Sequence, residues 1–164
     1  MIYTIGDTVI YPNHGAAVID DIETRHIKGE DITYLVLRIL VENGLVIRAP
    51  TCNLGPIGVR EVIDTHGLKQ VLDTLGAEST ADHSNWSRRF KDNTGKLRTG
   101  CVFGVAEVVR DLWRRDRAGH LSAMERHMLG KARQILASEL AHCQRTNHDK
   151  AQELVDEALL VRER

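Results

Sequence analysis

The feature that most constrains the fold is a change of hydrophobic period near residue 60. Before that point, apolar residues come in short β-branched runs that are broken by turn residues; from about residue 65 they recur every three or four positions. Runs of the first kind are typical of strands, and a 3.6-residue repeat is typical of amphipathic helices. The sequence therefore predicts an α+β protein with a β module over residues 1–60 and an all-α helical bundle over residues 65–164.

The first half contains four or five expected strands. The clearest runs are Thr8–Tyr11, Ala16–Ile27, Tyr34–Val41 and Leu45–Arg48. Asn43-Gly44 separates the last two, and this pair between apolar runs favours a two-residue hairpin with a type I′ turn, because both central residues of that turn need positive φ. So many short strands in so short a segment predict a strongly bent sheet or a small β-barrel, since a flat sheet of that size buries too little apolar surface.

The second half is predicted to be helical. Ser122 and Glu125 form the pattern of a capping box, in which the serine hydroxyl accepts from the Glu125 N–H and the glutamate side chain returns to the Ser122 N–H. Residues 78–83 are polar and indicate a connector. The expected helices cover Gly67–Leu75, Ser84 or Asn85 to Leu97, Val102–Arg117, Ser122 to Leu140, and Asp149–Val161.

The net charge of −1 conceals a basic middle third. Residues 1–80 contain 6 Lys/Arg and 11 Asp/Glu, residues 81–133 contain 12 and 6, and residues 134–164 contain 4 and 6. Electrostatic fields act over a Debye length of about 8–10 Å, so the neutral total says nothing against a polyanionic partner of the middle third.

The segment Asn85-Trp86-Ser87-Arg88-Arg89-Phe90-Lys91 admits two interpretations. Trp86 and Phe90 lie four residues apart on one helical face, which is typical of core aromatics. Alternatively, a large ring framed by cations at a helix start suits a wedge in the DNA minor groove, because the cations hold phosphates while the ring fills an unstacked base step. Trp113 continues the apolar stripe of its helix and is expected in the core.

Two further groups of arginines also have two interpretations. Arg114 and Arg115 extend the polar face of the Val102–Arg117 helix, either as a solvated face that complements the helix dipole or as nucleic-acid contacts. Arg25 and Arg48 lie on expected strands, either as ordinary surface charge or as residues that flank an exposed sheet edge where a partner strand is recruited.

The sequence offers no motif for covalent chemistry. The three cysteines are Cys52, Cys101 and Cys143, and they form neither a CxxC pair nor a disulfide framework. An HExxH motif and a phosphate-binding glycine loop are also missing. We therefore expect no enzyme, no metal and no cofactor. The chain lacks an apolar run long enough for a membrane helix and a secretory signal at its start, so it predicts a soluble cytoplasmic protein without a membrane partner.

Several runs together resemble the CarD (CdnL) family of bacterial transcription regulators, in particular its actinobacterial branch. The resemblance covers nearly the whole chain in order, with departures between Asn43 and Gly55 and after Cys143. The runs that carry it in the first half are Ile5-Gly6-Asp7-Thr8-Val9-Ile10-Tyr11-Pro12-Asn13-His14-Gly15, Ile22-Glu23-Thr24-Arg25, Ile27-Lys28-Gly29-Glu30, Tyr34-Leu35-Val36-Leu37 and Gly58-Val59-Arg60-Glu61-Val62. Those in the second half are Asn85-Trp86-Ser87-Arg88-Arg89-Phe90-Lys91, Ala106-Glu107-Val108-Val109-Arg110-Asp111-Leu112-Trp113-Arg114-Arg115-Asp116 and Lys131-Ala132-Arg133-Gln134-Ile135-Leu136.

This resemblance implies that residues 1–60 are a Tudor-like domain that binds the β subunit of RNA polymerase. It also implies that the helical domain contacts promoter DNA at the upstream edge of the transcription bubble, with little sequence specificity. The positions of Arg25 and Arg48 would then face the polymerase.

In the same resemblance, Trp86 would be the minor-groove wedge that stabilises the open complex, and Arg88, Arg89 and Lys91 would line the adjacent backbone. We add Arg114 and Arg115 as DNA contacts from the charge pattern. The expected state is a monomer associated with the nucleoid through the polymerase. The alternative is a polymerase-docking adaptor whose helical domain recruits another protein, with Trp86 as the interface anchor.

Overall fold

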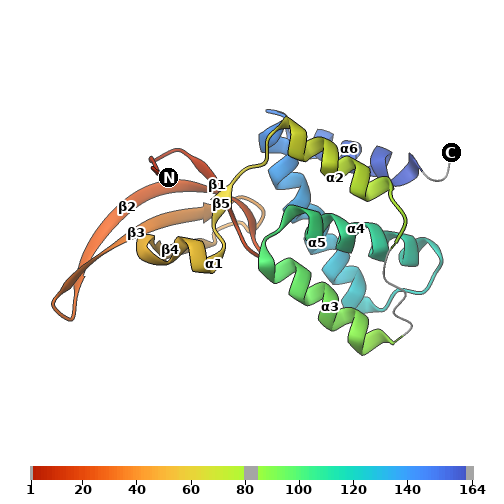
Figure 1. Cartoon of the computed structure of the whole chain (residues 1–164), viewed down its shortest axis with the longest axis horizontal. Coiled ribbons are helices and arrows are strands. Elements are labelled where there is room, and N and C mark those ends of the chain that lie inside the picture. The colour runs from red at the N-terminus through yellow and green to blue at the C-terminus, as the bar shows by residue number, and fades with distance from the viewer. Residues whose placement is uncertain (1, 80–84, 162–164) are drawn as a thin grey trace.

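A computed structural model describes residues 2–79 and 85–161 of the chain. Figure 1 shows two halves side by side, a β half with one long hairpin that reaches away from its neighbour, and a bundle of helices. The β half is a five-stranded antiparallel sheet with the strand order β4-β3-β2-β1-β5. Its strands are β1 (Thr8–Tyr11), β2 (Gly15–Ile27), β3 (Glu30–Ile39), β4 (Val46–Pro50) and β5 (Arg60–Glu61). A short η1 (Thr51–Asn53) and α1 (Leu54–Ile57) join β4 to β5. The α+β prediction is confirmed.

The sheet has one apolar face and one solvated face. Ala17, Ile19, Leu35 and Leu37 are buried on the inner face, where Leu54 of α1 also packs. The register shifts between Ile19 and Asp21, and this bulge bends β2. The described residues show no pairing between β4 and β5, so the sheet is bent and open rather than a closed barrel.

The type I′ turn predicted at Asn43-Gly44 is wrong. In that loop only Gly44 has positive φ, at 83°, and Leu45 N–H donates to the Glu42 carbonyl, which is the pattern of a type II turn. The two-residue hairpin lies instead between β2 and β3, where Lys28 and Gly29 have φ of 50° and 83°. The expected strand Tyr34–Val41 correspondingly begins earlier and ends earlier, as β3.

The helices follow the predicted pattern closely. They are α2 (Thr65–Gly76), α3 (Trp86–Thr99), α4 (Val102–Arg117), α5 (Ala123–Cys143) and α6 (His148–Leu160). The capping box of Ser122 and Glu125 begins α5 as predicted, and Asn85 caps α3. Ser84, the other cap considered, and residues 80–83 of the connector lie outside the described residues.

Helix α4 is the centre of the bundle. Val108, Val109 and Leu112 on α4 have no exposed surface, and α2, α3 and α5 pack around them. Figure 1 shows α2 and α6 on one side of α4 and α3 on the other. Trp113, which was expected in the core, is half-buried against it, and the guanidinium of Arg117 lies 4.8 Å from its ring centre.

A partly buried ion pair joins the two halves. Arg60 on β5 donates from Nη1 and Nη2 to the two carboxylate oxygens of Glu139 on α5, at 2.7 and 2.8 Å. The same guanidinium donates to the Gly100 carbonyl, and Glu139 also accepts from the Ile63 N–H at 3.0 Å. Beside this pair, the Ala16 N–H donates to Ser138 Oγ at 3.0 Å, so β2 rests directly on α5.

Candidate functional site

Trp86 is the first residue of α3, and its ring lies at the surface. The side chain is 38% exposed, which is high for so large an apolar group. Its ring stacks on Phe90 one turn later, with 5.2 Å between the ring centres and 17° between the planes. Its indole Nε1–H donates to Ser122 Oγ at 3.0 Å. The indole is therefore outside the core and is also held in one orientation.

Ser122 belongs to a buried polar network behind the indole. Its Oγ accepts from the Glu125 N–H and donates to Glu125 Oε1, both at 3.2 Å. Arg89 donates from Nε to Glu125 Oε2 at 2.7 Å and from Nη2 to Oε1 at 3.1 Å. The starts of α3 and α5 are thus connected by a continuous path from Trp86 through Ser122 and Glu125 to Arg89.

Electrostatics keep both members of the Arg89–Glu125 pair charged. Burial alone raises the pKa of Glu125, but hydrogen bonds from Arg89 and from the Ser122 N–H outweigh it and hold the pKa below its ordinary value. The hydrogen bond to Glu125 raises the pKa of Arg89. Because breaking a buried pair leaves an uncompensated charge, this pair fixes the geometry beneath the indole.

Arg89 does not lie at the surface, where a residue that contacts the DNA backbone was expected. It is 8% exposed and lies on the buried face of α3 with Asn93 and Leu97, at helical spacing of four residues. Arg88 and Lys91 are exposed on the remaining faces, and neither forms an ion pair with any described residue. Only these two of the three predicted cations near Trp86 are placed to meet a phosphate.

Arg114 and Arg115 do not form the solvated polar face that was one interpretation of the sequence, because both are partly buried. Arg114 is half-buried and donates to the Ala77 carbonyl at 2.6 Å and to Ser79 Oγ at 2.9 Å, so it holds the chain that leaves α2. Arg115 is half-buried. Together with Arg89 and Arg114, it lines a hollow of about 250 Å³ between α3 and α4. The structure brings these guanidiniums together, but it uses Arg114 to fasten elements of the fold.

A groove between α3 and α5 begins beside the indole, and the sequence reasoning missed it. Phe90, Leu97, Met124 and Met128 form its apolar surface. Arg98 of α3 and Lys131 of α5 line it, and in the described part of the chain neither has an ion-pair partner. Arg98 lies eight residues after Phe90 on α3, a spacing that places both on the same side of a helix, and this was the available signal.

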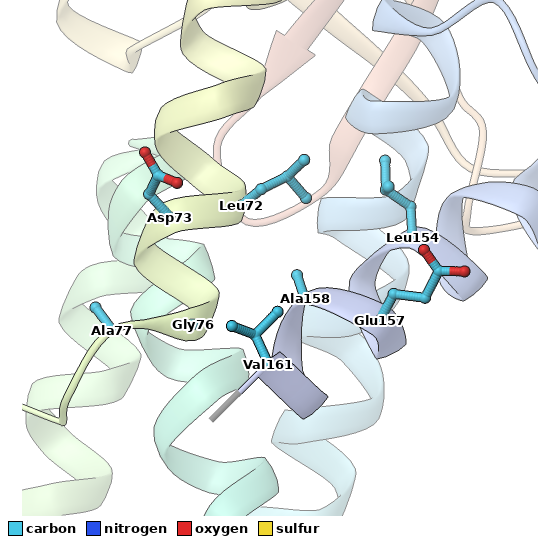
Figure 2. A pocket seen from close by; sticks show the side chains of 8 residues that line it. All are labelled: Leu72, Asp73, Gly76, Ala77, Leu154, Glu157, Ala158 and Val161. Carbon is cyan, nitrogen blue, oxygen red and sulfur yellow. The ribbon is translucent and has the colours of Figure 1, made fainter. Parts of the chain in front are cut away.

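A second hollow, between α2 and α6, has the opposite charge. Figure 2 shows Leu72 and Val161 at its apolar centre, with Asp73 and Glu157 on either side. Two carboxylates beside the hollow repel phosphate, so this side of the bundle does not suit a nucleic acid.

Arg25 and Arg48 meet on the solvated face of the sheet. Arg25 Nη2 lies 3.1 Å and Arg48 Nε 3.4 Å from the same oxygen, Glu23 Oε2. Both side chains are about half exposed, so these pairs are weak and can exchange for a partner's carboxylates. Arg48 lies on β4, an edge strand of the sheet. The predicted polymerase-facing residues therefore share one surface beside an open edge.

Within the described residues, no group of three or more His, Cys, Asp or Glu side chains is arranged to hold a metal ion. The three cysteines are free, and burial raises the pKa of the Cys143 thiol, with help from the carboxylates of Glu139 and Asp64. A raised pKa disfavours the thiolate that a nucleophile needs. In the part of the chain that the structure describes, no helix is long and apolar enough to cross a membrane.

Comparisons with known proteins agree with this two-part architecture. Residues 3–63 match the CarD-like/TRCF RID domain, and residues 70–156 match the CarD C-terminal domain. A Bacillus subtilis (strain 168) protein described as "Putative transcription factor YdeB" is 36% identical over 138 residues, which cover 84% of this chain and 90% of that protein. These matches indicate a transcription regulator that interacts with RNA polymerase. The chain belongs to the CarD family.

Proposed function

We propose that this protein stabilises open promoter complexes by binding the RNA polymerase β subunit with its sheet and promoter DNA with its helical half. The observation that carries the proposal is the partly exposed indole of Trp86, which Ser122 fastens and which is flanked by Arg88 and Lys91, two cations that form no ion pair with a described residue. A ring framed by cations is the arrangement that a minor-groove wedge needs.

The polymerase contact is proposed for the surface of Arg25, Arg48 and the β4 edge. An exposed edge strand offers backbone N–H and C=O groups to an added strand, and flanking arginines fix its register through carboxylates. The tether raises the effective concentration of the helical half at the promoter without any new DNA contact. The ion pair between Arg60 and Glu139 connects the sheet to the bundle, so the position of the sheet on the polymerase also determines the position of the bundle.

The DNA contact shifts the closed–open equilibrium only by its differential affinity for the two states. A ring that fits only a parted base step has such a difference. A contribution of about 1–3 kcal/mol changes the open-to-closed ratio roughly 5–150-fold. Phosphate contacts carry no sequence information, so the action is general rather than operator-specific.

The experiment is a promoter-opening assay with purified polymerase and the full chain. We expect Trp86→Ala to lose most of the stabilisation of the open complex while it still unfolds cooperatively, with a loss of about 1–3 kcal/mol from the stacking on Phe90 and the hydrogen bond to Ser122. Unchanged opening by Trp86→Ala contradicts the wedge. A protein that binds polymerase and leaves the bubble edge open to footprinting reagents would instead be an adaptor for another protein.

The two surfaces are separated by a second pair of variants. Arg48→Glu is expected to abolish polymerase binding and to leave binding to free DNA intact, because the sheet face carries only the first contact. Lys69→Glu makes the same charge change at an exposed position on α2 and serves as the control. Equal loss of both activities in Arg48→Glu contradicts the division of labour.

A further inference from the structure

The groove between α3 and α5 combines an apolar surface with cations. Phe90 and Leu97 come from α3, and Met124 and Met128 come from α5. Met124 is 56% exposed although it is apolar. The volume is about 550 Å³, within the range of about 300–1,000 Å³ that small-ligand sites have. Apolar surface that remains exposed beside a groove is one mark of an interaction site.

The charge of the groove selects an anionic ligand. Arg98, Lys131 and His127 line it, and no Asp or Glu does among the described residues. Arg98 and Lys131 have no ion-pair partner in the described chain, whereas Arg89, Arg126 and Arg133 on the same two helices are all paired with carboxylates. On α3 and α5, the cations without an ion-pair partner among the described residues therefore lie at the groove and near Trp86.

The groove is continuous with the wedge. Phe90 stacks on Trp86 and also lines the groove, and the lining residue Ala123 follows Ser122, which holds the indole. At the other end lies Asn13 of the β1–β2 turn. Its neighbour Pro12 packs against Gly100, where an added Cβ would lie 2.9 Å from Pro12 Cγ. From Phe90 to Arg98 the helix rises about 12 Å, so the part of α3 that lines the groove is only about two turns long.

We infer that this groove receives an unpaired nucleotide of the promoter strand that has just left the duplex, and the inference rests on the proposed function above. The base would lie against Phe90 and the methionine thioethers, since every base has a flat face that stacks on aromatic rings. The flanking phosphates would meet Arg98 and Lys131. A long amphipathic peptide helix fits less well, because the lining of the groove on α3 extends for only about two helical turns.

The test uses the full chain and short DNA without polymerase. One DNA is a full duplex, and the other is a fork with the same duplex and a single-stranded arm that carries 2-aminopurine at its first unpaired position. We expect the fork to bind at least fivefold more tightly than the duplex, with a change in 2-aminopurine fluorescence on binding. Equal affinity for the two DNAs, or fluorescence that does not change, overturns the inference.

Variants then assign the preference to the groove. Met124→Glu places a carboxylate at an exposed groove position and is expected to remove the fork preference, whereas Met124→Leu keeps it. Val161→Glu makes an equal change at an exposed site on the far side of the bundle and is the matched control. A fork preference that survives Met124→Glu contradicts the inference. An acidic peptide that binds the groove while the fork DNA stays bound also contradicts it, because the DNA then does not occupy the groove.

This experiment also separates the inference from the proposed function. If Met124→Glu loses the fork preference and still supports promoter opening through Trp86, the groove binds a nucleotide but adds little to opening. If Trp86→Ala leaves promoter opening unchanged, the proposed function fails whatever the groove binds.

Discussion

The indole N–H of Trp86 donates to the Ser122 hydroxyl at 3.0 Å, although the two residues are 36 positions apart in the sequence. This hydrogen bond fastens the first residue of α3 to the N-cap of α5. One hydroxyl thus performs two tasks, since it also accepts from the Glu125 N–H as part of the capping box. The orientation of the proposed wedge depends on the start of a helix that does not contain it.

The first prediction concerns this hydroxyl. Ser122→Ala should lose about 1 kcal/mol of stability, the usual effect of removing an N-cap, and should also release the indole. Asn147→Ala removes the cap of α6 and is the matched control, because α6 lies on the opposite side of α4 from α3 (Figure 1). In a Trp113→Phe background, we expect Trp86 fluorescence and promoter opening to change only in Ser122→Ala. Identical fluorescence in the two cap variants would mean that the hydroxyl does not hold the ring.

The second prediction concerns the Arg89–Glu125 pair. Arg89→Ala leaves the Glu125 carboxylate buried without a cation and should cost about 3–5 kcal/mol of unfolding free energy, as for other broken buried pairs. The exposed pair Arg126–Asp116 is the control, since Asp116→Asn should cost less than about 1 kcal/mol. Similar losses in urea denaturation of the two variants would contradict the burial of Arg89.

The same pair predicts a dependence on pH. The folded-state pKa of Glu125 is lower than its unfolded value, so its contribution to stability is fully present above about pH 4.3 and is lost as pH falls through the folded pKa. The difference in unfolding free energy between the wild type and Glu125→Gln should therefore be constant from pH 7 to 5 and should narrow below about pH 4.3. A difference that widens on acidification would have the wrong sign.

Local signals explain which parts of the fold were predictable. The helix Val102–Arg117 was predicted with its exact ends, because its apolar stripe is regular and Gly119 follows. The hairpin predicted at Asn43-Gly44 is present, since β3 and β4 pair antiparallel across that loop, but its turn is type II rather than the predicted type I′. The two-residue turn lies at Lys28-Gly29, between β2 and β3. Lys28 adopts φ of 50° there because the long ladder on both sides fixes the turn.

The site was harder to predict, because its geometry depends on contacts between distant segments. The position of Trp86 at a helix start was visible in the sequence, but the inward turn of Arg89 depends on Glu125, 36 residues away. Arg98 and Lys131 lie on two helices that only the tertiary fold brings together. The Arg60–Glu139 joint, which spans 79 positions, leaves no local pattern at all.

The third prediction concerns that joint. Glu139→Gln keeps the shape of the side chain but removes the charge that Arg60 meets, so it should destabilise the chain by about 1.5–3 kcal/mol, the usual range for hydrogen bonds to a charged group, because Arg60 is 29% exposed and keeps some solvation. Glu107→Gln, in the half-exposed pair with Lys96, is the control and should cost less than about 1 kcal/mol. We also expect Glu139→Gln to keep polymerase binding while promoter opening falls, because the tether no longer fixes the bundle. Unimpaired opening would show that a rigid joint is not needed.

The last prediction concerns four cations that form no ion pair with a described residue. They are Arg88, Lys91, Arg98 and Lys131. If three or four of them meet phosphates, the logarithm of the binding constant for free DNA should fall with the logarithm of salt concentration at a slope of about −3 to −4. Lys91→Gln and Lys131→Gln should each make the slope shallower by about 0.9, because each removes one released counterion. Lys150→Gln removes an exposed cation on α6, on the acidic side of the bundle, and should leave the slope unchanged. A salt response that is flat, or that Lys150→Gln alters as much as Lys131→Gln, would show that net charge rather than this surface governs the affinity.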